Sequence, residues 1–414
     1  MGNPLQVRDG NGNVRKTDYN ALNLPWLVYD PAPFDGQVTE TTYYKTGKVK
    51  SVRNRRGYVT TYEYDELNRL KKVTDPRNQT IETTYDRVGN VKTVKDKRTI
   101  LTENDYDELN RLKETRRAGI RLVTNDYDEV GNLRFVTDAK GYRTGHIYTG
   151  RNLLDTTTFP DTTTRKRTYD GAGNLITETD EEEKVTTYGY DRENRQTSVE
   201  LAGETTQKRY NSVGSLVEII KPEGTSRTLD YDKLRRLTSV TEGDLSTRYE
   251  YDANGNLRHQ FDPRENHVEY TWDELNRKKE QIQHKASGTL VTRFAEYDPE
   301  GNLSRLIDPK GQEFTYGYDE LNRRTDEQLP QTATPYLTLT TVHTEYDGNN
   351  NVTGITETKR DPLGATVTDT TANIYDDFDR VKTSTQRGLT VSYDYDANGN
   401  RTTVATAAGA TTST

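Results

Sequence analysis

Histidine and carboxylate side chains are the groups in this sequence that could hold a metal ion. The closest grouping is His259, Asp262, Glu265 and His267, which fall within nine residues. A metal site needs ligands that converge on one point, whereas these residues are expected along a polar strand and its turn. The pattern therefore predicts no metal site, and no cofactor is expected.

A second acidic pattern, Asp252, Asn254 and Asn256, is similar to the start of a calcium-binding loop. Leu257 stands where an EF-hand needs glycine, and no glutamate follows at the twelfth position of the loop. Asp and Asn side chains also bond to nearby backbone in tight turns. We therefore expect these residues to shape a turn.

Catalytic patterns are absent from the sequence. Paired carboxylates such as Asp65-Glu66 and the run 180–183 carry little information in a chain with 66 acidic residues. The chain has no cysteine, which excludes a thiolate nucleophile, a disulfide and a Cys-ligated zinc site. No phosphate-binding loop, nucleophile elbow or Ser/His/Asp set stands out. We expect no catalytic residues and no enzyme activity.

The composition is polar but unlike that of a disordered chain. Apolar residues make up 30% and the mean hydropathy is −1.04, yet the chain contains 28 tyrosines. The 58 basic and 66 acidic residues are interspersed, so no basic face is expected for nucleic acid or for a membrane surface. No apolar run approaches the roughly 18 residues of a membrane-spanning helix.

One stretch, Tyr64-Asp65-Glu66-Leu67-Asn68-Arg69-Leu70, recurs along the whole chain. Its step is 21 residues from Tyr64 to Tyr190, and mostly 20 or 21 elsewhere. A fixed period of this size indicates stacked supersecondary units. Eighteen copies begin at Tyr19, Tyr44, Tyr64, Tyr85, Tyr106, Tyr127, Tyr148, Tyr169, Tyr190, Tyr210, Tyr231, Tyr251, Trp272, Tyr297, Tyr318, Tyr346, Tyr375 and Tyr395.

Each unit has the pattern of a β-hairpin. Residues 70–86 hold two runs rich in Thr, Val, Ile and Tyr on either side of a Pro/Asn turn. The recurring motif supplies the second turn, in which Asp can bond the backbone while Gly and Asn accept positive φ. Copies alternate between a Leu-Asn-Arg form and a Gly-Asn form, so alternate turns should lie in different environments.

We expect the repeated signature residues to be structural. They are Tyr64, Asp65, Tyr85, Asp86, Gly89, Asn90, Tyr106, Asp107, Tyr127, Asp128, Gly131, Asn132, Tyr169, Asp170, Gly173, Asn174, Tyr251, Asp252, Gly255, Asn256, Trp272, Asp273, Tyr297, Asp298, Gly301, Asn302, Tyr318, Asp319, Tyr395 and Asp396.

A second tyrosine often stands two residues before the signature aromatic, as Tyr62 does before Tyr64. Residues two apart share a face of a strand, so stacked hairpins would carry aromatic ladders. Packing and hydroxyl bonding between hairpins are the expected role, and a sugar-binding platform is the alternative. Leu70 and Val73 are three apart, which puts them on opposite faces unless a bulge intervenes.

The whole chain is predicted to be all-β, with tandem hairpins joined in one long sheet. About 36 strands at roughly 4.8 Å each would make a ribbon about 170 Å long, and so long a twisted sheet has to coil. A hollow spiral shell or tube with a polar, Tyr-lined inner surface would protect its edges. We assign residues 1–404 to one continuous array and residues 405–414 to a Thr/Ala-rich end.

The motif Tyr-x-Tyr-Asp-x-x-Gly-Asn/Arg-Leu, followed by Thr-Asp-Pro-x-Gly, resembles the Rhs/YD-repeat family. The resemblance implies a spiralling β-strip around a hollow chamber, as in the shells of Tc and polymorphic toxins, wall-associated proteins and teneurins. Toxin shells of the family end in an autoproteolytic aspartate pair and an effector. Asp361-Pro362-Leu363-Gly364 resembles only a fragment of that ending, lies within an insertion and is interpreted as a turn.

The leading hypothesis is a non-catalytic shell fragment that encloses or presents a partner polypeptide, such as an effector or a flanking part of a longer polypeptide. The first alternative is a cell-surface adhesin that binds glycans or proteins through its turns. The second is self-assembly into a fibre through exposed strand edges. The resemblance implies a secreted or cell-surface protein. Residues 1–4 show no secretory signal, and we expect these residues to belong to a longer polypeptide.

Overall fold

The computed structural model describes residues 3–285, 287–330, 338–361, 363–406 and 409–412. Within these residues the chain forms 38 strands of a single sheet and no helix. Successive strands pair antiparallel along the whole chain. The prediction of one continuous all-β sheet is confirmed, and the final strand lies inside the Thr/Ala-rich end.

The strands in chain order are β1 (Gln6–Arg8), β2 (Val14–Tyr19), β3 (Pro25–Tyr29), β4 (Val38–Tyr43), β5 (Val49–Arg53), β6 (Val59–Tyr64), β7 (Leu70–Thr74), β8 (Thr80–Tyr85), β9 (Val91–Lys95), β10 (Leu101–Tyr106), β11 (Leu112–Arg117), β12 (Ile120–Tyr127), β13 (Leu133–Asp138), β14 (Arg143–Tyr148), β15 (Leu154–Thr158), β16 (Thr164–Tyr169), β17 (Leu175–Thr179), β18 (Val185–Tyr190) and β19 (Gln196–Leu201). They continue as β20 (Glu204–Tyr210), β21 (Leu216–Ile220), β22 (Ser226–Tyr231), β23 (Leu237–Glu242), β24 (Leu245–Tyr251), β25 (Leu257–Phe261), β26 (His267–Trp272), β27 (Lys278–Lys285), β28 (Gly288–Tyr297), β29 (Leu303–Ile307), β30 (Glu313–Tyr318), β31 (Arg324–Gln328), β32 (Thr338–Tyr346), β33 (Val352–Arg360), β34 (Thr366–Tyr375), β35 (Val381–Gln386), β36 (Leu389–Tyr395), β37 (Arg401–Thr406) and β38 (Gly409–Thr412).

Turns at the two edges of the ribbon are of two kinds. Signature turns, such as 65–69, follow the strand that ends in the signature aromatic, and return turns, such as 75–79, join the other ends. We call the two edges the signature edge and the return edge. In the second copy the strand ends at Tyr43, and Tyr44 occupies the position of the signature Asp. The assignment of that copy to Tyr44 is therefore wrong by one residue.

A β-bulge in each unit settles the direction of its apolar side chains. Tyr64 pairs with Leu70 and Tyr62 pairs with Val73, and the register shifts between the two pairs. The extra residue, Lys71, allows Leu70 and Val73 to share the face of the tyrosines although they are three apart. The same shift recurs in later hairpins, and it gathers Tyr, Leu and Val on one face of the ribbon.

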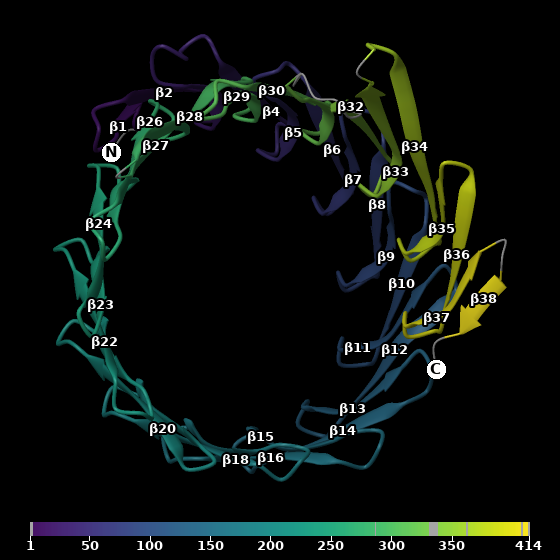
Figure 1. Cartoon of the computed structure of the whole chain (residues 1–414). Helices are drawn as coiled ribbons and strands as arrows, with labels where there is room; N and C mark the ends of the chain where they lie inside the picture. The colour runs from purple at the N-terminus through teal and green to yellow at the C-terminus, as the bar shows by residue number, and fades with distance from the viewer. Residues whose placement is uncertain (1–2, 286, 331–337, 362, 407–408, 413–414) are drawn as a thin grey trace.

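The ribbon coils into a ring that overlaps itself (Figure 1). Signature turn 252–256 contacts return turn 9–13, which separates a first coil, β1 to β24, from a second coil, β25 to β38. The second coil lies along the return edge of the first. The sheet does not close on itself, and its end strands are β1 and β38.

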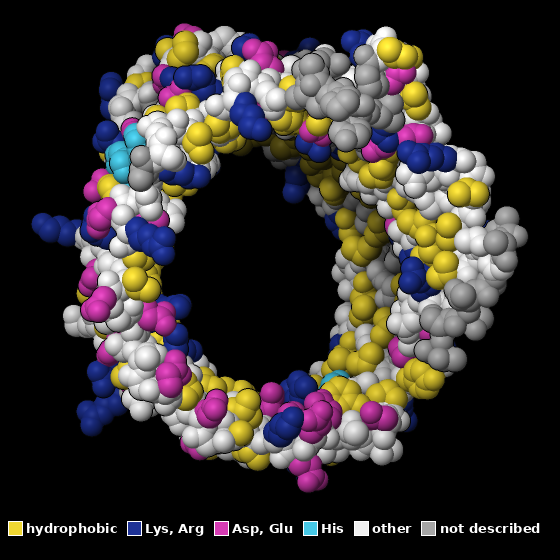
Figure 2. All heavy atoms as spheres, in the orientation of Figure 1, with side chains coloured by type: hydrophobic (Ala, Val, Ile, Leu, Met, Phe, Trp, Pro, Cys, Tyr) yellow, Lys and Arg dark blue, Asp and Glu magenta, His cyan; other side chains and the backbone are white. Residues whose placement is uncertain are grey.

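The ring surrounds an open interior (Figure 2). Hydrophobic side chains line much of its visible inner wall, whereas the histidines of β26 and β27 gather on the outside. By register, His267 and His284 lie on the face opposite the signature aromatic of their strand, so the Tyr, Leu and Val face points inward. The inner wall is thus more apolar than the polar lining we expected. No hydrophobic side chain of the described residues is fully buried, as befits a wall one sheet thick.

Candidate functional site: the turns and the seam between the coils

Signature residues hold the same places in unit after unit. The aromatic residues that end strands are Tyr64, Tyr85, Tyr106, Tyr127, Tyr169, Tyr251, Trp272, Tyr297, Tyr318 and Tyr395. The acids that begin the turns are Asp65, Asp86, Asp107, Asp128, Asp170, Asp252, Asp273, Asp298, Asp319 and Asp396. The glycines, all at positive φ, are Gly89, Gly131, Gly173, Gly255 and Gly301. The asparagines that follow them are Asn90, Asn132, Asn174, Asn256 and Asn302.

The signature Asp organises its own turn. Oδ1 of Asp65 accepts hydrogen bonds from the amides of Leu67 and Arg69, at 3.0 and 2.9 Å. The hydrogen bond from the Arg69 amide lowers the pKa of Asp65. Desolvation opposes this shift, and the Arg69 side chain adds to it. This is the turn chemistry expected for Asp, and it accounts for Asp252, Asn254 and Asn256 as well.

The alternation of turn forms has a physical cause. In the Leu-Asn-Arg turn, Arg69 donates to Asp65 Oδ2 at 2.7 Å, donates to the carbonyl of Asp86 at 3.2 Å, and lies 4.5 Å from the ring centre of Tyr85. A Cβ at Gly89 would stand 4.0 Å from that guanidinium, and its φ of 106° suits glycine. In return, Asn90 donates to Asn110 of the next turn at 3.1 Å.

Signature aromatics bond the neighbouring hairpin. The hydroxyl of Tyr85 donates to the carbonyl of Leu70 at 2.8 Å, and Tyr231 donates to Leu216 at 2.9 Å. Trp272 keeps the contact with its indole N–H, 2.9 Å from the carbonyl of Leu257. Ring-to-ring ladders do not form as expected. Among the described residues one tyrosine pair is in ring contact, and arginines lie over several signature rings, including those of Tyr85, Tyr127 and Tyr251.

The seam is the contact between return turns of the first coil and signature turns of the second. At its start Asn11 donates to Asp252 Oδ2 through its side chain and to Asn254 Oδ1 through its backbone, both at 2.9 Å. Asn254 donates back to Asp9 at 2.9 Å. Gly10 faces the Ala253 carbonyl so closely that a Cβ would overlap it. The turns therefore meet backbone to backbone.

Arginines carry the next part of the seam. The amide of Arg55 donates to the Glu300 carboxylate at 2.6 Å. The guanidinium of Arg56 donates to the carbonyls of Tyr318 and Asp319, both at 2.8 Å, and lies 3.6 Å from Asp298 Oδ2. Binding to carbonyls as well as carboxylates uses the fork of the guanidinium, which lysine lacks.

An arginine pair surrounds Asp379. Arg98 donates to Asp379 Oδ1 at 2.7 Å and to the Asp376 carbonyl at 2.8 Å, and Arg117 donates to Asp379 Oδ2 at 3.0 Å. Asn349 joins the cluster from the second coil. Burial opposes ionisation of Asp379, but bonds from Asn349, Arg98 and Asn351 outweigh it, so its pKa is lowered.

The seam ends at Asp396. Lys140 Nζ lies 3.2 Å from Asp396 Oδ2, and Asn398 donates to Asp138 at 2.7 Å. The side-chain bond from Asn400, helped by the Asn400 amide and Lys140 against desolvation, lowers the pKa of Asp396 to about 2.

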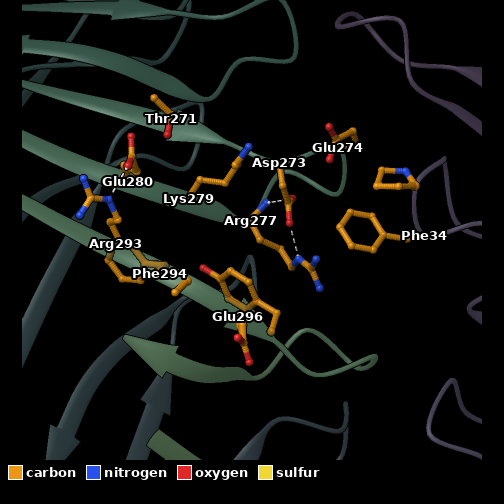
Figure 3. Close-up of a pocket in the computed structure, with 13 residues that line it drawn as sticks. Phe34, Thr271, Asp273, Glu274, Arg277, Lys279, Glu280, Arg293, Phe294 and Glu296 are labelled. Atoms are coloured by element: carbon orange, nitrogen blue, oxygen red, sulfur yellow. Dashed lines mark hydrogen bonds and ion pairs between the residues drawn. The ribbon is translucent and has the colours of Figure 1, made fainter. Parts of the chain in front are cut away.

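A pocket of about 920 Å³ opens at the seam, where loop 30–37 meets signature turn 273–277. Figure 3 shows Arg277 between Asp273 and Phe34. Its guanidinium lies 4.7 Å from the ring centre of Phe34 and 4.6 Å from that of Tyr297, and donates to Asp273 at 2.7 Å. This arginine joins the two coils through an aromatic contact.

Sequence reasoning missed the return-edge half of this site. Arg55, Arg56, Arg98 and Lys140 stand in return turns that we assigned no role. Their signal is a run of basic return turns between residues 54 and 142, which faces acidic signature turns between 298 and 396. That match can be recognised only when one knows how many residues separate the turns that meet across the seam.

The remaining candidates do not form a site. His267 and His284 stack with ring centres 4.0 Å apart, but no group of three or more His, Asp or Glu residues in the described chain could hold a metal. Asp361 bonds the amides of Leu363 and Ala365 as a turn residue, and Pro362 lies outside the described residues. No helix among the described residues has the length and hydropathy needed to cross a membrane.

Comparisons with known proteins agree with the fold. A family model described as teneurin YD-shell matches residues 220–334, and one described as RHS repeat matches residues 43–80, 169–206 and 375–411. No curated protein matches the chain.

Solved structures of TcdB2-TccC3 proteins share the architecture. TcdB2-TccC3-TEV is similar with a TM-score of 0.77 and 13% identity, over 96% of this chain and 25% of that chain. TcdB2-TccC3 without its hypervariable C-terminal region gives a TM-score of 0.60 and 14% identity, over 97% and 26%. The chain thus spans about a quarter of the length of these proteins. Together, the registered repeats, the coiled sheet and both family models establish that the chain belongs to the Rhs/YD-repeat family.

Proposed function

We propose that this chain is a non-catalytic wall segment of an Rhs/YD shell, which encloses or presents a partner polypeptide such as a toxin effector. The observation that carries the proposal is the seam: it joins two coils of one ribbon into a wall around an open interior. A wall one sheet thick, in which no hydrophobic side chain of the described residues is fully buried, is suited to bounding a space.

The chemistry of the inner face supports a polypeptide as the enclosed partner. Tyr62, Tyr64, Leu70 and Val73 of one hairpin share that face, and the pattern repeats around the ring. Apolar and aromatic surface of this kind favours contact with the side chains of an unfolded chain. The similar solved proteins contain TccC3, and one of them is described as lacking a hypervariable C-terminal region. The same resemblance supports a location outside the cell or at its surface.

Photocrosslinking tests the proposal. A crosslinking phenylalanine analogue replaces Val73, whose side chain points inward, or the adjacent Lys72, whose side chain points outward, in the full chain extended at Thr414 by an unfolded effector-like segment. We expect Val73 to crosslink to the extension and Lys72 not to. Equal crosslinking from both positions, or none from Val73, would refute enclosure.

A further inference from the structure

The third residue of the signature turns is one of the contact positions of the seam. In the second coil, Asn254 bonds Asp9, Glu300 accepts from the amide of Arg55, and Asn398 bonds Asp138. Apolar residues also occur at this position there, and Leu275, Leu321 and Phe378 are all partly buried. Along the described part of the seam, this position is partly buried in every signature turn except that of Asn398.

In the first coil the same position is exposed, and in seven of the turns it holds a large apolar residue. Leu67 and Leu109 are 67% exposed and Val130 is 72% exposed. The exposed large apolar residues at this position are Leu22, Leu67, Val88, Leu109, Val130, Val213 and Leu234. Exposed Thr46, Arg151, Ala172 and Glu193 occupy it in the other signature turns of the first coil. A row of exposed apolar residues along one edge marks an interaction surface. In the second coil the same turn position lies against a return edge, so a return edge is the kind of surface expected to cover this row.

A matching surface lies at the opposite end of the molecule. The return edge of the second coil exposes Arg264 and Lys310, and Leu363 there is 95% exposed. The covered return edge of the first coil is likewise basic, with Arg55, Arg98 and Lys140. Exposed Glu108 and Glu129 stand beside the apolar row of the first coil and are opposite in charge to Arg264 and Lys310, although exposed Arg87 lies in the same row of turns.

We propose that the signature edge of the first coil binds the return edge of the second coil of another copy of this chain. This contact between two chains has the same geometry as the seam that joins the two coils within one chain. It does not depend on any enclosed partner. Because the two surfaces differ, the association is head to tail and extends into stacked tubes instead of closing as a dimer.

Two edge variants test the proposal. The first carries Leu67→Glu, Leu109→Glu and Val130→Glu at the signature edge, and the second carries Arg264→Glu, Lys310→Glu and Leu363→Glu at the return edge. Control substitutions are Ile147→Glu and Ile374→Glu, which alter exposed residues within strands, outside the turns that form the two edges. Circular dichroism checks that each variant folds.

Light scattering over a range of concentrations gives the readout. We expect the unaltered chain and the control to grow beyond the 47.3 kDa monomer, and each edge variant to stay monomeric. An equal mixture of the two edge variants has one intact pair of edges, so its mass should double and stop there. An unaltered chain that stays monomeric, edge variants that still assemble, or a mixture without a dimer would each overturn the proposal.

Discussion

The guanidinium of Arg98 lies 2.8 Å from the backbone carbonyl of Asp376, although 278 residues separate them. Such contacts hold the second coil on the first, since the sheet hydrogen bonds join only neighbouring strands. The curvature of the ribbon brings the two turns together, and the seam fixes that curvature. The stability of the coil should therefore be sensitive to single residues that bridge the seam.

Arg98→Ala is expected to loosen the second coil. The side chain is 18% exposed and bonds Asp379 as well as the Asp376 carbonyl, so its loss leaves partly buried acceptors without a partner. We expect a cost of about 2 kcal/mol, with faster amide exchange in turns 96–100 and 376–380. Arg87→Ala, at an exposed position of the free signature edge, is the control and should change neither quantity. Equal exchange in the two variants would contradict the role given to the seam.

Close approach of backbones gives a second test with a matched pair of glycines. Gly348 and Gly171 hold the same position in two signature turns, one at the seam and one at the free edge. A Cβ at Gly348 would stand 2.8 Å from Lys97 Cβ, whereas one at Gly171 would meet nothing within 4 Å. Gly348→Ala should lower the melting temperature and raise exchange at the seam. Gly171→Ala should leave both unchanged, and the same effect from both substitutions would contradict the contact.

Local features of this fold were predictable because each unit repeats them. Short-range chemistry explains the turn at Asp65 and the hydrogen bonds of the signature tyrosines. Because the pattern occurs in eighteen copies, it can be recognised in the sequence. The bulge at Lys71 was left open, because a spacing of three fits either a bulge or a change of face. Tyr44 was mistaken for the signature aromatic, because Tyr43 precedes it and its turn lacks Asp.

Long-range features were not predictable. Arg56 and Asp319 are 263 residues apart, and their pairing depends on how many hairpins complete one coil. That number follows from the summed twist and bend of all the strands, to which each unit contributes little. The apolar character of the inner face was also not predictable, because the bulge in each hairpin decides on which face Leu70 lies.

The hydroxyl bond between hairpins gives a third prediction. Tyr231 donates to the Leu216 carbonyl, so Tyr231→Phe removes one bond while keeping the ring. We expect a loss of about 1 kcal/mol in the free energy of unfolding, measured with urea. Tyr142→Phe is the control, because that side chain is 51% exposed and its ring contact with Lys140 does not need the hydroxyl. Losses of equal size would show that the bond contributes nothing.

Acid should open the seam only well below neutral pH. The bond from Asn400, with Lys140, lowers the pKa of Asp396 to about 2, and the pKa of Asp379 is also lowered, since bonds from Asn349 and Arg98 outweigh its burial. A carboxyl whose pKa is lower in the folded chain stabilises that chain above its unfolded pKa of about 3.9. This contribution is lost as pH falls toward the folded value.

We therefore expect the free energy of unfolding to be steady from about pH 7 to 5, and to fall between about pH 4 and 2. Asp396→Asn removes one such group, so the variant should be less stable than the unaltered chain at neutral pH, and the difference should shrink as pH falls through this window. Asp244→Asn, at an exposed return turn away from the seam, should follow the unaltered chain at every pH. A difference between Asp396→Asn and the unaltered chain that stays constant across the window would show that the Asp396 carboxylate does not stabilise the seam through its charge.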